Sequence, residues 1–145
     1  MSNKFFLDTN ILIYTFDDRD LGKRDRARAL VVEALSESRG IISYQVVQEF
    51  LNAALGKFVK PLTAGDAERY LKVVLEPLCA VFAGFDLYHQ AIDIAERWKY
   101  SFYDSLIIAS ALQAACSVLY SEDLQHGQKI GGLRILNPFV ESPRS

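Results

Sequence analysis

Short apolar runs alternate along the chain with longer segments in which apolar residues recur every three or four positions. The short runs are typical of buried strands, and the recurring positions are typical of amphipathic helices. The predicted strands cover residues 5–7, 41–43, 79–82, 117–120 and 133–136. A first helix is expected from residue 11, and further helices are expected over 27–35, 44–57, 63–77, 87–98 and 101–112.

This order of elements predicts an α/β fold. Strands separated by helical stretches form βαβ units, which build a mostly parallel sheet covered on both faces. The crossover connections should be right-handed. Because no repeat, low-complexity stretch or long linker divides the sequence, we expect residues 1–145 to form a single domain.

The composition is that of a folded chain, since half of the 145 residues are hydrophobic and 12% are aromatic. No apolar stretch approaches the length of a membrane-spanning helix, and the N-terminus lacks the pattern of a signal peptide. Cys79 and Cys116 lie in apolar surroundings without metal-ligand spacing, which indicates buried free thiols. These features favour a cytoplasmic protein that has no membrane partner.

The formal net charge of −2 does not by itself indicate a nucleic-acid partner. Five basic residues do follow soon after the first predicted strand: Arg19, Lys23, Arg24, Arg26 and Arg28. They could lie near a phosphate backbone, although a solvated helix face is the simpler interpretation.

The first strand stops at an acidic residue, Asp8. Ligands of open parallel sheets bind beyond the carboxyl ends of the strands, so Asp8 is placed where a ligand would be expected. An alternative is that Asp8 or Asn10 only caps the helix that follows.

Glu49 lies inside the apolar stripe of its predicted helix, three residues after Val46 and four before Ala53. A charged side chain is rarely buried without a partner, so Glu49 either reaches the rim of the core or faces a cation. A position at the edge of the stripe, with the carboxylate in solvent, explains it equally well.

Two further acids occupy comparable places. Asp104 begins the inward face of its helix, although it also fits a capping box opened by Ser101, as Asp66 does in an earlier helix. Asp123 follows the fourth strand and should lie at the same sheet edge as Asp8, unless it belongs to an ordinary polar loop. Glu122 competes with it in the same turn.

Convergence of these acids would require a compensating charge, because clustered carboxylates repel one another. Mg²⁺ or Mn²⁺ is the expected counter-charge, since both prefer oxygen ligands. Zinc is a poor candidate because no histidine or cysteine belongs to the set.

Four segments resemble PIN-domain ribonucleases of the VapC toxin type: residues 6–10 (Phe-Leu-Asp-Thr-Asn), 43–49, 102–111 and 119–127. The resemblance implies a three-layer α/β/α fold with a five-stranded parallel sheet of order 3-2-1-4-5. It implies metal-binding and catalytic roles for four acids: Asp8, Glu49, Asp104 and Asp123. Asn10 and Ser121 would support them by hydrogen bonds, and whether Glu122 joins the site stays open.

The same resemblance implies Mg²⁺- or Mn²⁺-dependent hydrolysis of RNA phosphodiester bonds, a homodimer and a protein antitoxin. Four apolar residues are candidate antitoxin contacts or ordinary core: Leu51, Leu55, Phe58 and Leu62. Two rival functions are a Mg²⁺-dependent aspartate phosphatase and a non-catalytic domain that binds RNA or protein. A phosphatase of that kind would require a second Asp two residues after its nucleophilic Asp, but the residue two positions after Asp8 is Asn10.

Overall fold

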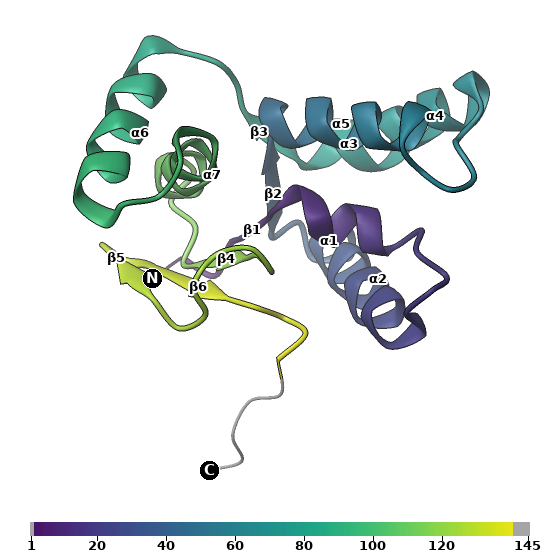
Figure 1. Cartoon of the computed structure of the whole chain (residues 1–145), viewed down its shortest axis with the longest axis horizontal. Helices are drawn as coiled ribbons and strands as arrows, with labels where there is room; N and C mark the ends of the chain where they lie inside the picture. Colours follow the sequence, from purple (N-terminus) through teal and green to yellow (C-terminus); the bar gives the residue numbers. More distant parts are fainter. Residues whose placement is uncertain (1, 141–145) are drawn as a thin grey trace.

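A computed structural model describes residues 2–140, which form one central sheet flanked by helices (Figure 1). The sheet contains β1 (Phe5–Leu7), β2 (Gly40–Ser43), β3 (Cys79–Val81), β4 (Val118–Tyr120), β5 (Lys129–Ile130) and β6 (Leu133–Leu136). Their order is β3-β2-β1-β4-β6-β5. All neighbouring strands from β3 to β6 run parallel, and the predicted five-strand order is thereby confirmed, with β6 as the predicted fifth strand.

The sixth strand, β5, was absent from the sequence prediction. It pairs antiparallel with β6 through a tight turn that contains Gly131 and Gly132. Gly131 has a φ of 59°, a left-handed conformation that glycine adopts without steric cost. The hairpin extends the sheet by two residues at its edge and leaves the parallel core unchanged.

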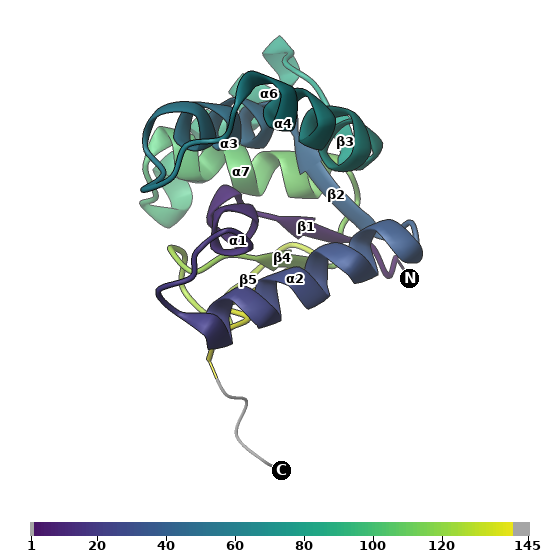
Figure 2. The same ribbon diagram turned by 90° about the vertical axis from the view of Figure 1, so that its right-hand side faces the viewer.

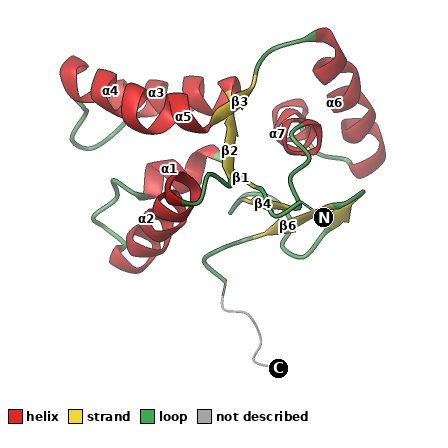
Figure 3. Cartoon of the chain, turned by 180° about the vertical axis from the view of Figure 1, so that it is seen from behind, coloured by secondary structure: helices red, strands yellow, loops and turns green. Residues whose placement is uncertain are grey.

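The helical segments are α1 (Thr9–Tyr14), α2 (Leu21–Ser36), α3 (Tyr44–Gly56), α4 (Ala64–Tyr70), the π-helical turn η1 (Leu71–Leu75), α5 (Glu76–Leu78), α6 (Phe85–Trp98) and α7 (Phe102–Gln113). Figures 1 and 3 show α6 and α7 on one side of the sheet and the remaining helices on the other. In Figure 2, α2 runs across the face that α1 also covers. Both faces are therefore shielded, as the βαβ pattern predicts.

The core explains why β1 is apolar at every position. All three β1 residues are buried because helices cover both faces of the central strand. Ile42 and Leu119 extend this core from the two neighbouring strands. Burying a side chain of this size contributes roughly 1.5–3 kcal/mol, so the backbone at the end of β1 is held firmly.

Several helices begin at the polar caps that the sequence predicts. Thr63 Oγ1 accepts a hydrogen bond from the Asp66 N–H, and Ser101 Oγ accepts one from the Asp104 N–H. Cys79 and Cys116 are free thiols, and Cys116 is buried. Within residues 2–140, no helix combines the length and apolar character needed to cross a membrane.

Close approach of two backbones makes Gly40 a sensitive position. An added Cβ would lie 2.1 Å from the Ala34 Cβ and 2.8 Å from the Ala34 Cα. Gly40→Ala should therefore lower the free energy of unfolding by about 1–3 kcal/mol, the usual cost of overpacking. Urea denaturation followed by circular dichroism would measure the change.

Gly56→Ala is the matched control, because a Cβ at Gly56 meets nothing within 4 Å. Its free energy of unfolding should stay the same or rise slightly. Equal stability of both variants would contradict the steric explanation.

Candidate active site

Adjacent strands β1 and β4 place Asp8 beside Ser121. Leu7 pairs with Tyr120 across the two strands, so Asp8 and Ser121 follow at the same carboxyl edge of the sheet. Ser121 Oγ donates a 2.7 Å hydrogen bond to Asp8 Oδ2. The Thr9 N–H donates a 2.7 Å hydrogen bond to Asp8 Oδ1, so Asp8 also caps α1. Asp8 is only 7% exposed, and its orientation is fixed from both sides.

A second hydrogen bond joins the start of α1 to the loop after β4. Asn10 Nδ2 donates to Asp123 Oδ2 at 2.9 Å, and the Asp123 N–H donates to Ser121 Oγ at 3.2 Å. Ser121 thus contacts both acids. The supporting roles predicted for Asn10 and Ser121 fit these contacts, because one orients Asp123 and the other orients Asp8.

Glu49 reaches this edge from α3 at the rim of the core. Its Oε1 accepts a 2.8 Å hydrogen bond from Thr9 Oγ1. Sequence reasoning did not assign Thr9 a role, although a hydroxyl residue directly after the acid that ends a strand was a usable signal. Thr9 therefore links the two acids, because its N–H binds Asp8 and its hydroxyl binds Glu49.

Electrostatics couple three of the acids. Desolvation by burial raises the pKa of Asp8 to about 6; hydrogen bonds from Ser121 and Thr9 act to lower it, and the negative charges of Glu49 and Asp123 raise it further. The ionised Asp8 carboxylate is therefore destabilised in the metal-free protein. A cation at this edge would reverse that effect.

Asp104 lies in the first turn of α7, on a different element from the other three acids. Gln45 Nε2 donates a 3.3 Å hydrogen bond to the Tyr103 carbonyl oxygen and so ties the start of α7 to α3. Within residues 2–140, no hydrogen bond joins the Asp104 carboxylate to Asp8 or to the residues that contact Asp8. Among residues 2–140, no three acidic, histidine or cysteine side chains lie close enough to form a complete metal site.

The donor set nevertheless suits a hard ion that retains water. Asp8, Glu49 and Asp123 supply carboxylate oxygens, and the buried Asn10 Oδ1 has no hydrogen-bond partner in the described structure. Mg²⁺ usually keeps several water ligands, so carboxylates can bind it through water without crowding. Hydrogen bonds through Thr9, Ser121 and Asn10 place Asp8, Glu49 and Asp123 at one edge of the sheet, although not as a complete set of ligands. Asp104 lies on α7, and no hydrogen bond joins its carboxylate to that group in the described residues.

The family is established by comparison with known proteins. The model of the PIN domain matches residues 5–129. The chain belongs to the PIN-domain family. None of the curated protein sequences compared with this PIN domain matches it significantly.

Solved structures with this PIN fold include proteins of toxin–antitoxin systems. A toxin–antitoxin complex from Klebsiella pneumoniae has 19% sequence identity and a TM-score of 0.66, and the match covers 93% of this chain and 98% of that chain. VapC20 from Mycobacterium tuberculosis, described as a sarcin–ricin loop cleaving toxin, has 20% identity and a TM-score of 0.59, with 83% and 90% covered. DNA-bound VapBC from Salmonella typhimurium has 24% identity and a TM-score of 0.58, with 92% and 96% covered.

In this PIN domain the Glu122 side chain is bound by residues of α1 and α2, and not by the acids near Asp8. Tyr14 Oη donates to Glu122 Oε1 at 2.6 Å, and Lys23 Nζ donates to Glu122 Oε2 at 2.5 Å. Burial acts to raise the pKa of Glu122, but the hydrogen bonds from Lys23 and Tyr14 outweigh it and hold this pKa below its ordinary value. Glu122 therefore contacts a cationic partner of its own rather than the acids around Asp8.

The basic residues after β1 are engaged within the protein. Arg19 pairs with Asp17, and Arg24 pairs with Asp18 and Asp25. The guanidinium of Arg26 donates to the Pro138 carbonyl oxygen, and that of Arg28 donates to the Thr15 carbonyl oxygen. These internal contacts favour the simpler interpretation of the basic residues, which is a solvated surface where they pair with nearby groups of the same protein.

Aromatic side chains border the start of α7. Tyr103 is 67% exposed, and Phe102 is also exposed. The Tyr88 ring lies 6.4 Å from that of Phe102 and 6.2 Å from that of Phe85, which is 81% exposed. We call these four residues the aromatic rim. Sequence reasoning missed it, because Phe85 and Tyr88 join Phe102 and Tyr103 only after α6 packs on α7.

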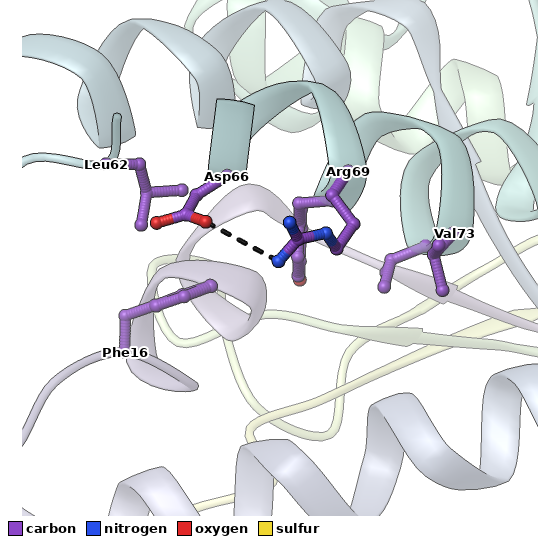
Figure 4. Close-up of a pocket in the computed structure, with 7 residues that line it drawn as sticks. Phe16, Leu62, Asp66, Arg69 and Val73 are labelled. Atoms are coloured by element: carbon purple, nitrogen blue, oxygen red, sulfur yellow. Dashed lines mark ion pairs between the residues drawn. The ribbon is translucent and has the colours of Figure 1, made fainter. Parts of the chain in front are cut away.

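A separate hollow of about 320 Å³ lies between the end of α1 and the segment α4–η1 (Figure 4). Phe16, Leu62 and Val73 contribute apolar walls, and Arg69 pairs with Asp66 at 3.6 Å. Of the four predicted antitoxin contacts, only Leu62 lines this hollow. Leu51 and Phe58 pack against the core, whereas Leu55 is exposed.

The pKa of Asp8 predicts how stability depends on pH. Because the pKa of Asp8 is 3.8 in the unfolded chain and about 6 in the folded protein, the destabilisation is absent below pH 3.8, grows as the pH rises from 3.8 to about 6, and is constant above that. Asp8→Asn should therefore raise the free energy of unfolding of metal-free protein by about 2–3 kcal/mol above pH 7. Asparagine can still cap α1 and contact Ser121. Urea denaturation of parent and variant without added metal, at about pH 4 and about pH 7.5, would measure this, because the effect develops between those values.

Asp86→Asn serves as the control, since Asp86 is an exposed acid in the first turn of α6. It should leave the pH dependence unchanged. A loss of stability in Asp8→Asn at pH 7.5 would contradict the burial argument.

Proposed function

We propose that this PIN domain is a Mg²⁺- or Mn²⁺-dependent ribonuclease that hydrolyses RNA phosphodiester bonds as the toxin of a toxin–antitoxin pair. The observation that carries the proposal is the hydrogen-bonded arrangement in which buried Asp8 is linked through Ser121 and Thr9 to Asp123 and Glu49. Burial raises the pKa of Asp8 to about 6, the neighbouring negative charges add to this effect, and groups with raised pKa values concentrate at functional sites. The PIN fold and its likeness to toxin structures support the same reading.

The residues have distinct roles in this proposal. Asp8 is the central ligand, because β1 fixes its backbone and Thr9 and Ser121 orient its two oxygens. Glu49 and Asp104 bind the ion directly or through water, and Asp123 acts through water under the control of Asn10. A bound divalent ion supplies a Lewis acid beside the scissile phosphate and an activated water. One of the carboxylates also accepts the proton of that water.

The aromatic rim supports an RNA substrate with unpaired bases. Phe102 and Tyr103 directly precede Asp104, and the rim continues through Tyr88 to exposed Phe85. The exposed rings offer flat faces on which nucleobases stack. The basic residues after β1 are paired internally, so stacking rather than a broad cationic surface would hold the RNA near the acids.

A non-catalytic RNA- or protein-binding domain is the second candidate, and membership of the PIN-domain family disfavours the aspartate phosphatase. Calorimetric titration with Mn²⁺ distinguishes the ribonuclease from the non-catalytic domain. Micromolar to millimolar binding that Asp8→Asn abolishes would support the ribonuclease, and absence of binding would support the non-catalytic domain.

An antitoxin is proposed as the protein partner, because several similar structures are toxin–antitoxin complexes. The hollow around Phe16, Leu62 and Val73 suits an apolar anchor from such a partner, with Arg69 and Asp66 available to polar groups. A homodimer is proposed on the same family grounds, and analytical ultracentrifugation would give its mass.

Asp104 and Asp66 provide a matched test of the catalytic assignment. Both acids lie three residues after a hydroxyl cap and occupy the first turn of a helix. Asp104→Asn should lower RNA cleavage at least 100-fold, because a metal ligand is lost, whereas Asp66→Asn should leave cleavage unchanged. The two changes should cost similar stability, about 0.3–1 kcal/mol each, since both remove a charge from a helix N-terminus. Cleavage of fluorescent RNA with Mn²⁺, with and without EDTA, would measure the effect.

Equal activity of the two variants would remove Asp104 from the site. Full cleavage by the parent protein in EDTA would contradict the metal-dependent mechanism as a whole.

Phe85→Ala tests the aromatic rim. Loss of one stacked base costs about 1–3 kcal/mol, so the KM for a single-stranded RNA should rise at least fivefold while kcat changes little. Steady-state cleavage kinetics would separate the two constants. Val32→Ala, an exposed apolar position on α2, is the control and should change neither. An unchanged KM in Phe85→Ala would exclude stacking at this ring.

A further inference from the structure

Glu122 occupies a position between two residues of the candidate site, yet its side chain binds elsewhere. Ser121 and Asp123 contact Asp8 and Asn10, whereas both carboxylate oxygens of Glu122 are taken by Tyr14 and Lys23. The loop after β4 is therefore held from two sides. We call the three residues Tyr14, Lys23 and Glu122 the loop clamp.

The loop clamp attaches the loop to α1 at two points. Asn10 binds Asp123, and Tyr14, four residues further along α1, binds Glu122. Residues four apart lie on the same face of a helix, so one side of α1 holds two successive residues of the loop. Lys23 adds a third attachment from α2.

The surroundings of the ion pair restrict its two side chains more than at an ordinary surface pair. The side chains of Lys23 and Glu122 are 33% and 25% exposed. Lys23 Nζ also lies 4.9 Å from the centre of the Tyr14 ring and 5.4 Å from that of Phe139. The two rings pack edge to face at 5.0 Å. Partial burial and aromatic faces on the ammonium group restrict Lys23 to this position.

We propose that the loop clamp positions the metal-binding edge, with Glu122 acting as a positioning residue and not as a ligand. Holding Glu122 against α1 and α2 keeps Ser121 on Asp8 and keeps Asp123 on Asn10. Turning Glu122 toward the acids would leave Lys23 half-buried without its partner and would add a further negative charge beside Asp8. The inference rests on the proposed metal-dependent function.

A charge-balanced double variant tests the proposal. E122Q/K23Q removes the ion pair and leaves the net charge unchanged, so a change in cation affinity cannot come from bulk charge. Supporting residues around metal ligands typically contribute about 10–100-fold in affinity, and we expect the lower end, about tenfold weaker Mn²⁺ binding by calorimetry. In cleavage of single-stranded RNA, kcat should fall while KM stays near the parent value, because the aromatic rim is intact.

Three further proteins make the test specific. D93N/R97Q removes an exposed ion pair on α6 with the same charge balance and should bind Mn²⁺ as the parent does. Tyr14→Phe removes the hydrogen bond from Tyr14 Oη to Glu122 and the longer one from Lys23 Nζ to Tyr14 Oη, without a charge change, and should weaken Mn²⁺ binding about threefold to fivefold. Lys23→Arg keeps a cation opposite Glu122 and should retain at least half of the parent affinity.

The outcomes are separable. Parent-like Mn²⁺ affinity in both E122Q/K23Q and Tyr14→Phe would overturn the positioning role. Weaker binding in E122Q/K23Q together with parent-like or tighter binding in Tyr14→Phe would identify Glu122 as a ligand and overturn it as well, because neither variant changes the net charge. If E122Q/K23Q fails to fold by circular dichroism, Tyr14→Phe and Lys23→Arg decide. A parent protein that binds no Mn²⁺ would instead refute the proposed function, and the inference with it.

Discussion

Burial of the Asp8 carboxylate at the end of β1 is the constraint around which this edge of the molecule is built. The group is removed from water by the core that fixes β1, and two neighbouring carboxylates raise the cost of its charge. Hydrogen bonds from Thr9 and Ser121 recover only part of that cost, because the pKa of Asp8 stays near 6. A purely structural cap would not need such burial. The arrangement is therefore poorly suited to the metal-free state and well suited to a cation.

The interactions around Asp8 also show that capping and function are compatible. One oxygen of Asp8 accepts from the α1 backbone, which stabilises the helix start, and the other accepts from Ser121 across the sheet. The capping explanation that the sequence left open for Asp8 thus applies to one oxygen, and it leaves the other oxygen directed toward β4. Because α1 begins at Asp8, it also carries Thr9 and Asn10 to the places where they meet Glu49 and Asp123.

The sequence predicted most of the fold because its strongest signals are local. Phe5, Phe6 and Leu7 form an apolar run that predicts a buried strand, and hydroxyl caps mark where several helices begin. β5 was missed because two residues carry no periodicity, and it exists only by pairing with β6. The choice between Glu122 and Asp123 was equally beyond local pattern. Glu122 is bound by residues 108 and 99 positions away, which no window around the loop contains.

Asp104 marks the limit of local reasoning most clearly. Asp104 and Asp66 share the same capping geometry, so nothing in their own helix turns separates a metal ligand from a structural acid. Their surroundings differ: the start of α7 is tied through Gln45 to α3, which carries Glu49, whereas the start of α4 borders the hollow and pairs with Arg69. The role proposed for Asp104 therefore rests on the helix that packs beside α7, and not on its capping pattern. Capping supplies acids in the first turn of both helices, and only the tertiary arrangement distinguishes the surroundings of one from those of the other.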